Sequence, residues 1–311
     1  MDSIEKNKTL VELGANGKTN GQTMKSDRLD VMKTYKIYID GKFPRTESGR
    51  FYPLNDSDGK LIANICLSSR KDFREAVVAA RKAQSGWSSK SAYNRGQVLY
   101  RIAEMLEGRR EQFIHELKAQ GSSTAQAEKE INLSIDRMLY YAGWCDKFQQ
   151  VFSAVNPVES SHFNFSVPEA MGVISILSAE NTGLLGLITA ISPAIAGGNA
   201  VVILASTSKP LSAVTLGEVL NSSDVPSGVV NILTGQRTEL LSHFSTHMDV
   251  NAIVYFGENG DEIKKLKESA SLNVKRVSIY KDDELYEDKT QNPYRIMDLQ
   301  EIKTTWHPIG Q

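Results

Sequence analysis

The feature that most constrains the fold is a regular alternation of short apolar segments with helix-like segments in the second half of the chain. Five segments rich in Val, Ile and Leu recur there, at 172–178, 200–204, 229–233, 252–256 and 275–279. The segments between them have the lengths of helices, at 184–196, 208–221, 237–245 and 260–271. Strands that are apolar throughout and alternate with helices are typical of a parallel sheet covered on both faces. We therefore predict an α/β fold with a doubly wound, mostly parallel, Rossmann-like sheet and helices on both faces.

The first half of the chain has a different organisation. Helical periodicity dominates residues 70–148, where Phe73, Val77 and Ala80, for example, recur on one face of a predicted helix. Two β-rich pieces around a polar turn follow at 151–168. The sequence therefore predicts an N-terminal helical region and a β arm in addition to the sheet.

Charge and composition exclude several classes of protein. The 36 basic and 37 acidic residues nearly cancel, so the basic surface of a nucleic-acid-binding protein is not expected. No apolar run approaches the roughly 18 residues that cross a membrane, and residues 1–33 lack the apolar core of a secretory signal. The two cysteines are too few for a disulfide framework. We expect a cytoplasmic protein without nucleic-acid or membrane partners, whose polar residues 1–33 form a disordered tail.

Ligands of doubly wound sheets bind outside the carboxyl ends of the strands. Residues Ser178–Thr182, Ala205–Thr207, Gly235 and Gly257–Asn259 fall at those ends. The dinucleotide motif G-x-G-x-x-G is absent from the sequence. A glycine at position 257 lets the backbone approach a phosphate before a helix, but it equally serves a tight strand-to-helix turn. Ser178, Gly235 and Gly257 are the candidate cofactor-binding residues.

Three further residues carry potential chemistry. His243 and His247 are four residues apart, a spacing that can chelate zinc on a helix. No Glu lies between them and no third ligand is evident, so the alternative is a pair of surface or capping histidines. Cys145 lies in a predicted helix where nothing nearby in the sequence would lower the pKa of its thiol, which favours a structural role. No metal site is predicted.

Several short motifs follow one another between residues 35 and 280. They read IDGKF, AVVAARKAQSGWSS, RGQVLYRIAEMLEGRREQF, IDRMLYYAGWCDK, PEAMGVISIL, ISPAIAGGNAVVIL, VPSGVVNILTG and VNAIVYFG. In this order they resemble the N-terminal, cofactor-binding part of the aldehyde dehydrogenase superfamily. The resemblance implies an aldehyde-dehydrogenase-like NAD(P)-domain fold made of residues 34–150 and 169–285, and implies that 151–168 is an oligomerisation arm. Residues 286–311 are unlike the catalytic half of the family and are predicted to form a C-terminal extension.

The resemblance also assigns a role to Asn181. Family members carry a Pro-Trp-Asn-Phe-Pro-like loop after the strand that matches GVISIL, and its Asn donates to the oxyanion of a thiohemiacetal; Asn181 falls on that position. The neighbouring residues differ, because Ala179 and Glu180 precede it and Thr182 and Gly183 follow it. Asn is also a common loop residue. We interpret Asn181 as a vestigial oxyanion donor in a rebuilt loop.

Other residues that the family would supply are replaced. The ribose-binding Lys-Pro-Ser-Glu stretch corresponds to Leu204–Thr207, and the Gly-Ser at the pyrophosphate corresponds to Gly257 and Glu258. The general-base Glu aligns with Tyr280, and no cysteine follows Cys145 to match the nucleophile. Aldehyde oxidation of this kind needs a thiolate, a hydride acceptor, an oxyanion donor and a base. Glu258 would in addition place a carboxylate against a phosphate.

Two functional hypotheses follow. The first is a non-catalytic association partner or regulatory subunit that binds no cofactor and forms homo- or hetero-oligomers, with a full-length aldehyde dehydrogenase as a candidate partner. The second is an NAD(P)-binding subunit of a composite aldehyde oxidoreductase whose thiol lies on another chain, with NAD or NADP as its cofactor. The C-terminal run around Trp306 is expected either to dock on this protein or on a partner, or to pack as a short extension.

Overall fold

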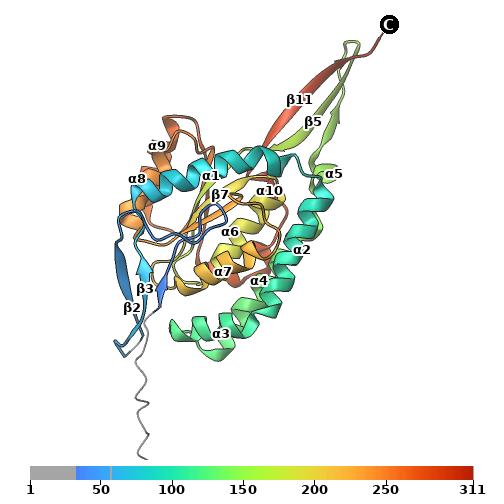
Figure 1. The fold of residues 1–311 in the computed structure, drawn as a ribbon. Coiled ribbons are helices and arrows are strands. Elements are labelled where there is room, and N and C mark those ends of the chain that lie inside the picture. The colour runs from blue at the N-terminus through green and yellow to red at the C-terminus, as the bar shows by residue number, and fades with distance from the viewer. Residues whose placement is uncertain (1–32, 57, 311) are drawn as a thin grey trace, which may run out of the picture. The chain divides into compact units, whose positions relative to one another are not determined.

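A five-stranded parallel sheet forms the centre of the fold in the computed structural model, which describes residues 33–56 and 58–310 (Figure 1). Its strands are β6 (Val173–Leu177), β7 (Ala200–Leu204), β8 (Val230–Leu233), β9 (Ala252–Phe256) and β10 (Arg276–Tyr280), in the spatial order β10-β9-β6-β7-β8. Every neighbouring pair is parallel. From β6 the chain first builds one half of the sheet and then crosses to build the other. The predicted doubly wound α/β fold is therefore confirmed.

Helices cover both faces of this sheet. One face carries α6 (Leu185–Ala196) and α7 (Leu211–Asn221), and these are covered in turn by α2 (Ala92–Gly108), α3 (Arg110–Ala119) and α4 (Thr124–Trp144). The other face carries α1 (Arg70–Ser88), α8 (Arg237–Thr246) and α9 (Gly260–Ser271). The side chains of β6 alternate between the two cores, with Ile174 and Ile176 in the first and Val173 and Leu177 in the second. Every residue of α6 is buried, which makes α6 the innermost helix of the first core.

A smaller sheet precedes these elements in the sequence. Its strands are β1 (Thr34–Tyr35), β2 (Phe51–Asn55) and β3 (Leu61–Cys66), in the order β1-β3-β2. An antiparallel bridge between Tyr38 and Ile232 joins this region to β8. The tail predicted at 1–33 lies outside the described residues except for Lys33. Of the helices that the structure describes, none is long and apolar enough to cross a membrane.

The predicted β arm is present as three antiparallel strands. β4 (Ala154–Asn156) follows the short helix α5 (Phe148–Phe152) and pairs with β5 (His162–Ala170). β11 (Gln300–Pro308), from the predicted C-terminal extension, pairs with the other edge of β5, from Gln300 opposite Ala170 to Pro308 opposite His162. Figure 1 shows β5 and β11 side by side along the arm. The arm therefore has a third strand, supplied by a segment far away in the sequence.

The residues between β10 and β11 pack against the rest of the chain. This return segment, residues 281–299, contains η1 (Asp283–Tyr286), η2 (Asp288–Thr290) and α10 (Tyr294–Met297). Leu285, Ile296 and Leu299 are buried in the same core as α4 and α6. The hydroxyl group of Tyr141 in α4 donates to a main-chain carbonyl of the segment at 3.1 Å. The return segment is therefore an integral part of the first core.

We expect Leu285→Ala to lower the free energy of unfolding by about 2–5 kcal/mol, because it leaves a cavity beneath the return segment. Leu285 is fully buried, whereas Leu272 at the end of α9 is 76% exposed. The matched control Leu272→Ala should change the free energy by no more than about 0.5 kcal/mol. Urea unfolding of the three proteins measures both effects. A small effect of equal size at the two positions would mean that the return segment does not belong to the core.

Candidate functional site

The carboxyl ends of the parallel strands surround a cavity of about 380 Å³. Its lining comes from the loops at the strand ends and from the first turns of α8 and α9. The residues of this strand-end cavity are Glu180, Thr207, Gln236, Arg237, Thr238, Tyr255, Gly257, Glu258, Asn259, Glu262 and Asp282. Because ligands of doubly wound sheets bind at this edge, the strand-end cavity is the first candidate site.

Arg237 occupies part of this edge, although the sequence pattern did not reveal it. Its Nε lies 3.4 Å from a carboxylate oxygen of Glu180, and its Nη1 lies 3.9 Å from one of Glu262. The guanidinium also donates to the main-chain carbonyls of Ser178 and Phe256. Only 12% of the side chain is exposed. Arg237 thus links the ends of β6 and β9 to α9.

The position of Arg237 explains why it is surrounded by carboxylates and by an aromatic ring. It is the first residue of α8, where the helix dipole disfavours a positive charge. Glu180 and Glu262 offset that cost, and the guanidinium lies 5.3 Å from the centre of the Tyr255 ring. The hydroxyl group of Tyr255 donates to Glu262 at 2.7 Å. Burial, together with this carboxylate, raises the pKa of Tyr255 to about 12, so the hydroxyl stays protonated.

The lining of the strand-end cavity is acidic. Glu180, Glu258, Glu262 and Asp282 contribute carboxylates, and Arg237 is the one basic residue among the lining residues that the structure describes. Burial raises the pKa of Asp282 above its usual value. A dinucleotide brings a negatively charged pyrophosphate, which these carboxylates would repel. The residues present therefore do not fit an NAD(P) pyrophosphate.

Asn181, the predicted oxyanion donor, is bonded to the return segment. Its Nδ2 donates to the main-chain carbonyl of Asp282 at 3.1 Å. The main-chain N–H of Glu180 donates to the carboxylate of Asp282 at 3.3 Å. Two hydrogen bonds therefore join the loop after β6 to the start of the return segment. The side-chain amide that the resemblance assigned to an oxyanion makes a contact within the chain.

A buried carboxylate fixes the other end of the same loop. Glu130 of α4 is 1% exposed, and its Oε1 accepts the main-chain N–H groups of Gly183, Leu184 and Leu185 at 2.9, 2.7 and 3.1 Å. Its Oε2 accepts the hydroxyl group of Tyr286 at 3.1 Å. The N-terminus of α6, where an anionic ligand could bind, is therefore already filled by a side chain. No local sequence signal points to Glu130, because it lies more than 50 residues before the loop.

The structure places the three candidate cofactor residues at the strand ends, where their main-chain groups are bonded, and the buried Oγ of Ser178 has no hydrogen-bond partner among the described residues. The N–H of Ser178 donates to the carbonyl of Leu204 at 3.1 Å. The carbonyl of Gly235 accepts the hydroxyl group of Thr207 at 3.0 Å. Gly257 has a φ of 143°, and a Cβ there would lie 2.8 Å from the hydroxyl oxygen of Tyr255. The turn geometry alone accounts for a glycine at position 257.

Three positions that the resemblance singled out have surroundings that the sequence did not indicate. Leu204 is buried in the second core, so a lysine there would place an ammonium group among apolar side chains. Glu258, which was expected to face a pyrophosphate, is 60% exposed and lies 3.2 Å from Lys281. The hydroxyl group of Tyr280 donates to Asp298 at 2.5 Å. The carboxylates of Glu180 and Glu262, which also line the strand-end cavity, are more buried than that of Glu258.

Both cysteines are buried and unpaired. Burial raises the pKa of the Cys145 thiol to about 12, and its Sγ donates to the carbonyl of Tyr141 at 3.3 Å. Burial also raises the pKa of Cys66. Neither thiol lines the strand-end cavity. A thiolate nucleophile is therefore not available from either residue near neutral pH.

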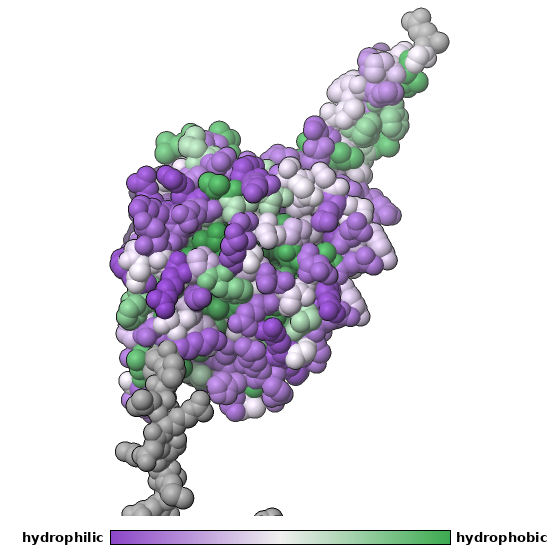
Figure 2. Space-filling model, viewed as in Figure 1, coloured by the Kyte–Doolittle hydropathy of each residue, from purple (hydrophilic) through white to green (hydrophobic). Residues whose placement is uncertain are grey.

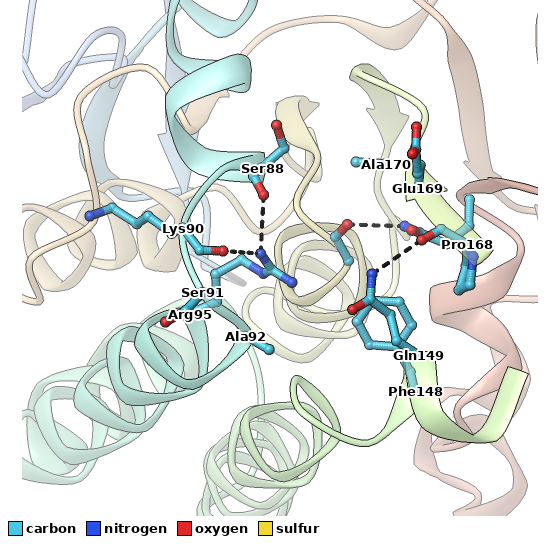
Figure 3. A pocket seen from close by; sticks show the side chains of 12 residues that line it. Ser88, Lys90, Ser91, Ala92, Arg95, Phe148, Gln149, Pro168, Glu169 and Ala170 are labelled. Carbon is cyan, nitrogen blue, oxygen red and sulfur yellow. Dashed lines mark hydrogen bonds between the residues drawn. The ribbon is translucent and has the colours of Figure 1, made fainter. Parts of the chain in front are cut away.

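A second cavity, of about 410 Å³, lies at the root of the arm (Figure 3). The guanidinium of Arg95 donates there to the carbonyls of Ser88 and Lys90, between α1 and α2. Gln149 donates to the carbonyl of Pro168 in β5 at 3.3 Å. These contacts hold the helix ends and the arm in place. We interpret this cavity as the anchor of the arm rather than as a reaction site.

Comparison with known proteins agrees with the geometry of the fold. The aldehyde dehydrogenase family model matches residues 43–280. The chain is 32% identical over 258 residues to cytosolic 10-formyltetrahydrofolate dehydrogenase of Mus musculus, with 81% of this chain and 29% of that protein covered. It is 31% identical over 252 residues to DhaS of Bacillus subtilis, with 79% and 50% covered. The chain thus spans half or less of the length of these curated relatives.

Solved structures give the same picture. PnpE from Pseudomonas sp. WBC-3 is 26% identical with a TM-score of 0.75, and the match covers 79% of this chain and 50% of that one. Another structure of PnpE contains nicotinamide adenine dinucleotide. An NAD⁺ complex of aldehyde dehydrogenase from Bacillus cereus has a TM-score of 0.76 at 22% identity, with 80% and 51% covered, and supports the fold alone.

We expect Arg237→Met to lower the free energy of unfolding by about 1–3 kcal/mol, because it leaves partly buried carboxylates without their cation. The matched control is Arg50→Met, since Arg50 pairs with Glu239 where both side chains are nearly half exposed, at 46% and 45%. That change should cost no more than about 0.5 kcal/mol. Denaturant unfolding at neutral pH measures both. Equal losses in the two variants would contradict the central role given to Arg237.

Proposed function

The chain belongs to the aldehyde dehydrogenase family, and we propose that it is a non-catalytic member that acts as an association partner or regulatory subunit of another protein chain. A full-length aldehyde dehydrogenase is the hetero-oligomeric partner that we propose first, because it would share the scaffold that carries the arm. The observation that carries this proposal is the pairing of Asn181 and Glu180 with Asp282. Through that pairing, the return segment engages the side-chain amide that would otherwise serve an oxyanion.

The chemistry of aldehyde oxidation provides the second argument. The reaction needs a thiolate nucleophile, and the thiols of Cys66 and Cys145 are buried away from the strand-end cavity. An oxyanion donor contributes roughly 10²–10³ in rate, so Asn181 alone could not replace a nucleophile. We therefore propose that Asn181 is vestigial, that Ser178, Gly235 and Gly257 serve the loops rather than a cofactor, and that the protein is a pseudoenzyme.

The arm supplies the surface for association. β11 is an edge strand of its sheet, and an edge strand presents unpaired main-chain groups to other chains. Val155, Phe163, Ile302 and Trp306 are between 45% and 68% exposed. Figure 2 shows hydrophobic residues along the arm. Exposed aromatic and apolar side chains beside a free edge favour a protein interface, so we propose that oligomers form through residues 151–168 together with β11.

The alternative is an NAD(P)-binding subunit of a composite aldehyde oxidoreductase whose thiol lies on another chain. One observation favours it, because the strand-end cavity of about 380 Å³ lies where ligands of such sheets bind. PnpE, at 26% identity, has been crystallised with nicotinamide adenine dinucleotide. The acidic lining around Arg237 is the counterargument. Affinity for NAD⁺ or NADP⁺ decides between the two hypotheses.

The cytoplasm is the compartment that we propose. The two cysteines are unpaired and buried, which suits a reducing environment.

We expect neither NAD⁺ nor NADP⁺ to bind measurably, because a pyrophosphate would meet the carboxylates of the strand-end cavity. Isothermal titration calorimetry measures this, with PnpE as the positive control. We also expect no NAD(P)H from a panel of aliphatic and aromatic aldehydes. A dissociation constant in the micromolar range would favour the composite enzyme. NAD(P)H formation that survives Cys66→Ser and Cys145→Ser would contradict the non-catalytic proposal.

We expect the chain to associate through its arm, with itself or with a full-length aldehyde dehydrogenase. Trp306→Asp places a charge on the exposed face of β11 and should weaken that association by about tenfold or more. Met248→Asp is the control, since Met248 is 72% exposed and lies outside the arm. Sedimentation velocity over a range of concentrations measures both. A strictly monomeric chain under all these conditions, or equal weakening by the two variants, would count against the proposal.

A further inference from the structure

A third cavity, of about 340 Å³, lies between α1 and α8 and shares no lining residue with the strand-end cavity. Its lining is unusually basic for a small pocket. The residues are Arg70, Phe73, Arg74, His243, Thr246 and His247. We propose that this basic cavity binds a phosphate group, either free phosphate or the phosphate of a small molecule, through its two guanidinium groups and two imidazoles.

The helical spacing of the residues creates the cluster. Arg70 and Arg74 are four residues apart at the start of α1, and His243 in the last turn of α8 lies four residues before His247, the residue that caps the end of that helix. Residues with this spacing lie on one face of a helix, so each helix presents a pair of basic side chains to the same cavity. The two pairs come from segments far apart in the sequence, which is why the sequence showed only the two histidines.

Aromatic packing and one hydrogen bond orient His247. Its ring meets the ring of Phe73 edge to face at 5.7 Å, and Phe73 in turn stacks on Phe244 at 4.2 Å. The Nδ1 of His247 accepts the main-chain N–H of Asp249 at 3.2 Å. This bond leaves Nε2 as the donor of the neutral ring. The imidazole is therefore held in one orientation before any ligand arrives.

The basic cavity has no counterion of its own among the described residues. Neither Arg70 nor Arg74 forms an ion pair there, and the carboxylate of Asp249, close to His247 in the sequence, lies 3.4 Å from Arg81. The positive end of the α1 dipole is capped by Ser69 and Asp72 and the negative end of the α8 dipole borders the same cavity, so the guanidinium groups of Arg70 and Arg74 are the main source of positive charge. An anion that enters the cavity would supply the missing negative charge.

The surroundings of the imidazoles disfavour their protonated forms while the cavity holds no anion. Burial lowers the pKa of His243, and the nearby Arg70 lowers it further. Burial is also the main cause of the lowered pKa of His247; Asp249 acts against it, whereas Lys275 and Arg74 add to it. A bound dianion would favour the protonated form of His243, whereas His247, whose Nδ1 accepts the N–H of Asp249, can donate from Nε2 as a neutral ring. Binding should therefore take up protons and become stronger as the pH falls.

A metal ion is a poorer occupant than an anion. Two histidines four residues apart can chelate zinc, but a zinc site needs further ligands. No group of metal-binding residues is found in the part of the chain that the structure describes. The guanidinium groups of Arg70 and Arg74 would also repel a cation. Phosphate, in contrast, has several oxygens that accept charged donors from both helices.

The first experiment uses sulfate, which keeps two negative charges between pH 6 and pH 8, so that any pH effect reports on the protein. Calorimetric titration of the full chain at constant ionic strength should give tighter sulfate binding at pH 6 than at pH 8. The double variant His243→Gln, His247→Gln should lose this pH dependence. His115→Gln, in an exposed position on α3, should keep it. No binding at either pH, or equal affinity at the two, would overturn the proposal.

The second experiment uses the arginines and inorganic phosphate. Arg74→Gln removes one charged donor and should weaken phosphate binding by about tenfold or more. Lys82→Gln is the matched control, because Lys82 is exposed on the same helix but does not line the basic cavity. Unfolding curves without added anion check that both variants fold. If both variants weakened phosphate binding equally, the effect would come from the overall charge of the protein, and the proposed site would be wrong.

A third experiment distinguishes the source of the phosphate group. Titration with glycerol phosphate should be compared with inorganic phosphate under the same conditions. Tighter binding of the ester would support a small organic phosphate, and tighter binding of the free ion would support inorganic phosphate. Failure of both to compete with sulfate would overturn the proposal. None of these measurements depends on NAD(P) binding or on association through the arm.

Discussion

The fold depends on one buried carboxylate. Glu130 is 1% exposed, and a charged group at such a depth needs donors that replace its lost hydration. It receives three main-chain N–H groups at the start of α6 and the hydroxyl group of Tyr286. The side chain of Glu130 therefore caps the N-terminus of α6, fixes the loop that carries Asn181 and binds the return segment. The helix start that could have received an anionic ligand is stabilised by an anion from the protein itself.

Charged and polar side chains at the strand ends also bind partners within the chain. Arg237 places a cation beside Glu180 and Glu262, and the carboxylate and carbonyl of Asp282 take donors from the loop after β6. A reaction site normally keeps some polar groups free for its substrate, because their bonds must form in the transition state. Here Glu180, Asn181 and Arg237 bind groups of the chain itself, whereas the Oγ of Ser178 and one carboxylate oxygen of Asp282 have no hydrogen-bond partner among the described residues. The internal pairing of Asn181 and Glu180 with Asp282 is the part of this arrangement that supports the proposed non-catalytic role.

The fold was predictable from the sequence to a much greater extent than the site. The continuous apolar runs located all five strands of the main sheet, and the run at 252–256 has the same bounds as β9. Such runs are local, because β6, β7, β8 and β9 are buried on both faces, and the edge strand β10 is half-buried. The partners of Arg237, in contrast, come from α9 and from the loop after β6, and β11 joins the arm from the far end of the described chain. Contacts of this kind leave no periodic signal, so only the structure reveals them.

The proposed association requires that the arm avoid indiscriminate pairing and yet remain available for a specific partner. Lys303 on β11 pairs with Glu169 on β5 at 3.0 Å, and a charged edge opposes pairing with arbitrary strands. The strand ends at Pro308, which cannot donate to a further ladder. Between these features, Trp306 lies edge to face with His162 at 5.8 Å and is still 57% exposed. Lys303 and Trp306 are three residues apart and point to opposite faces of β11, so in the proposed association a partner would meet the charge on one face of the arm and the aromatic side chain on the other.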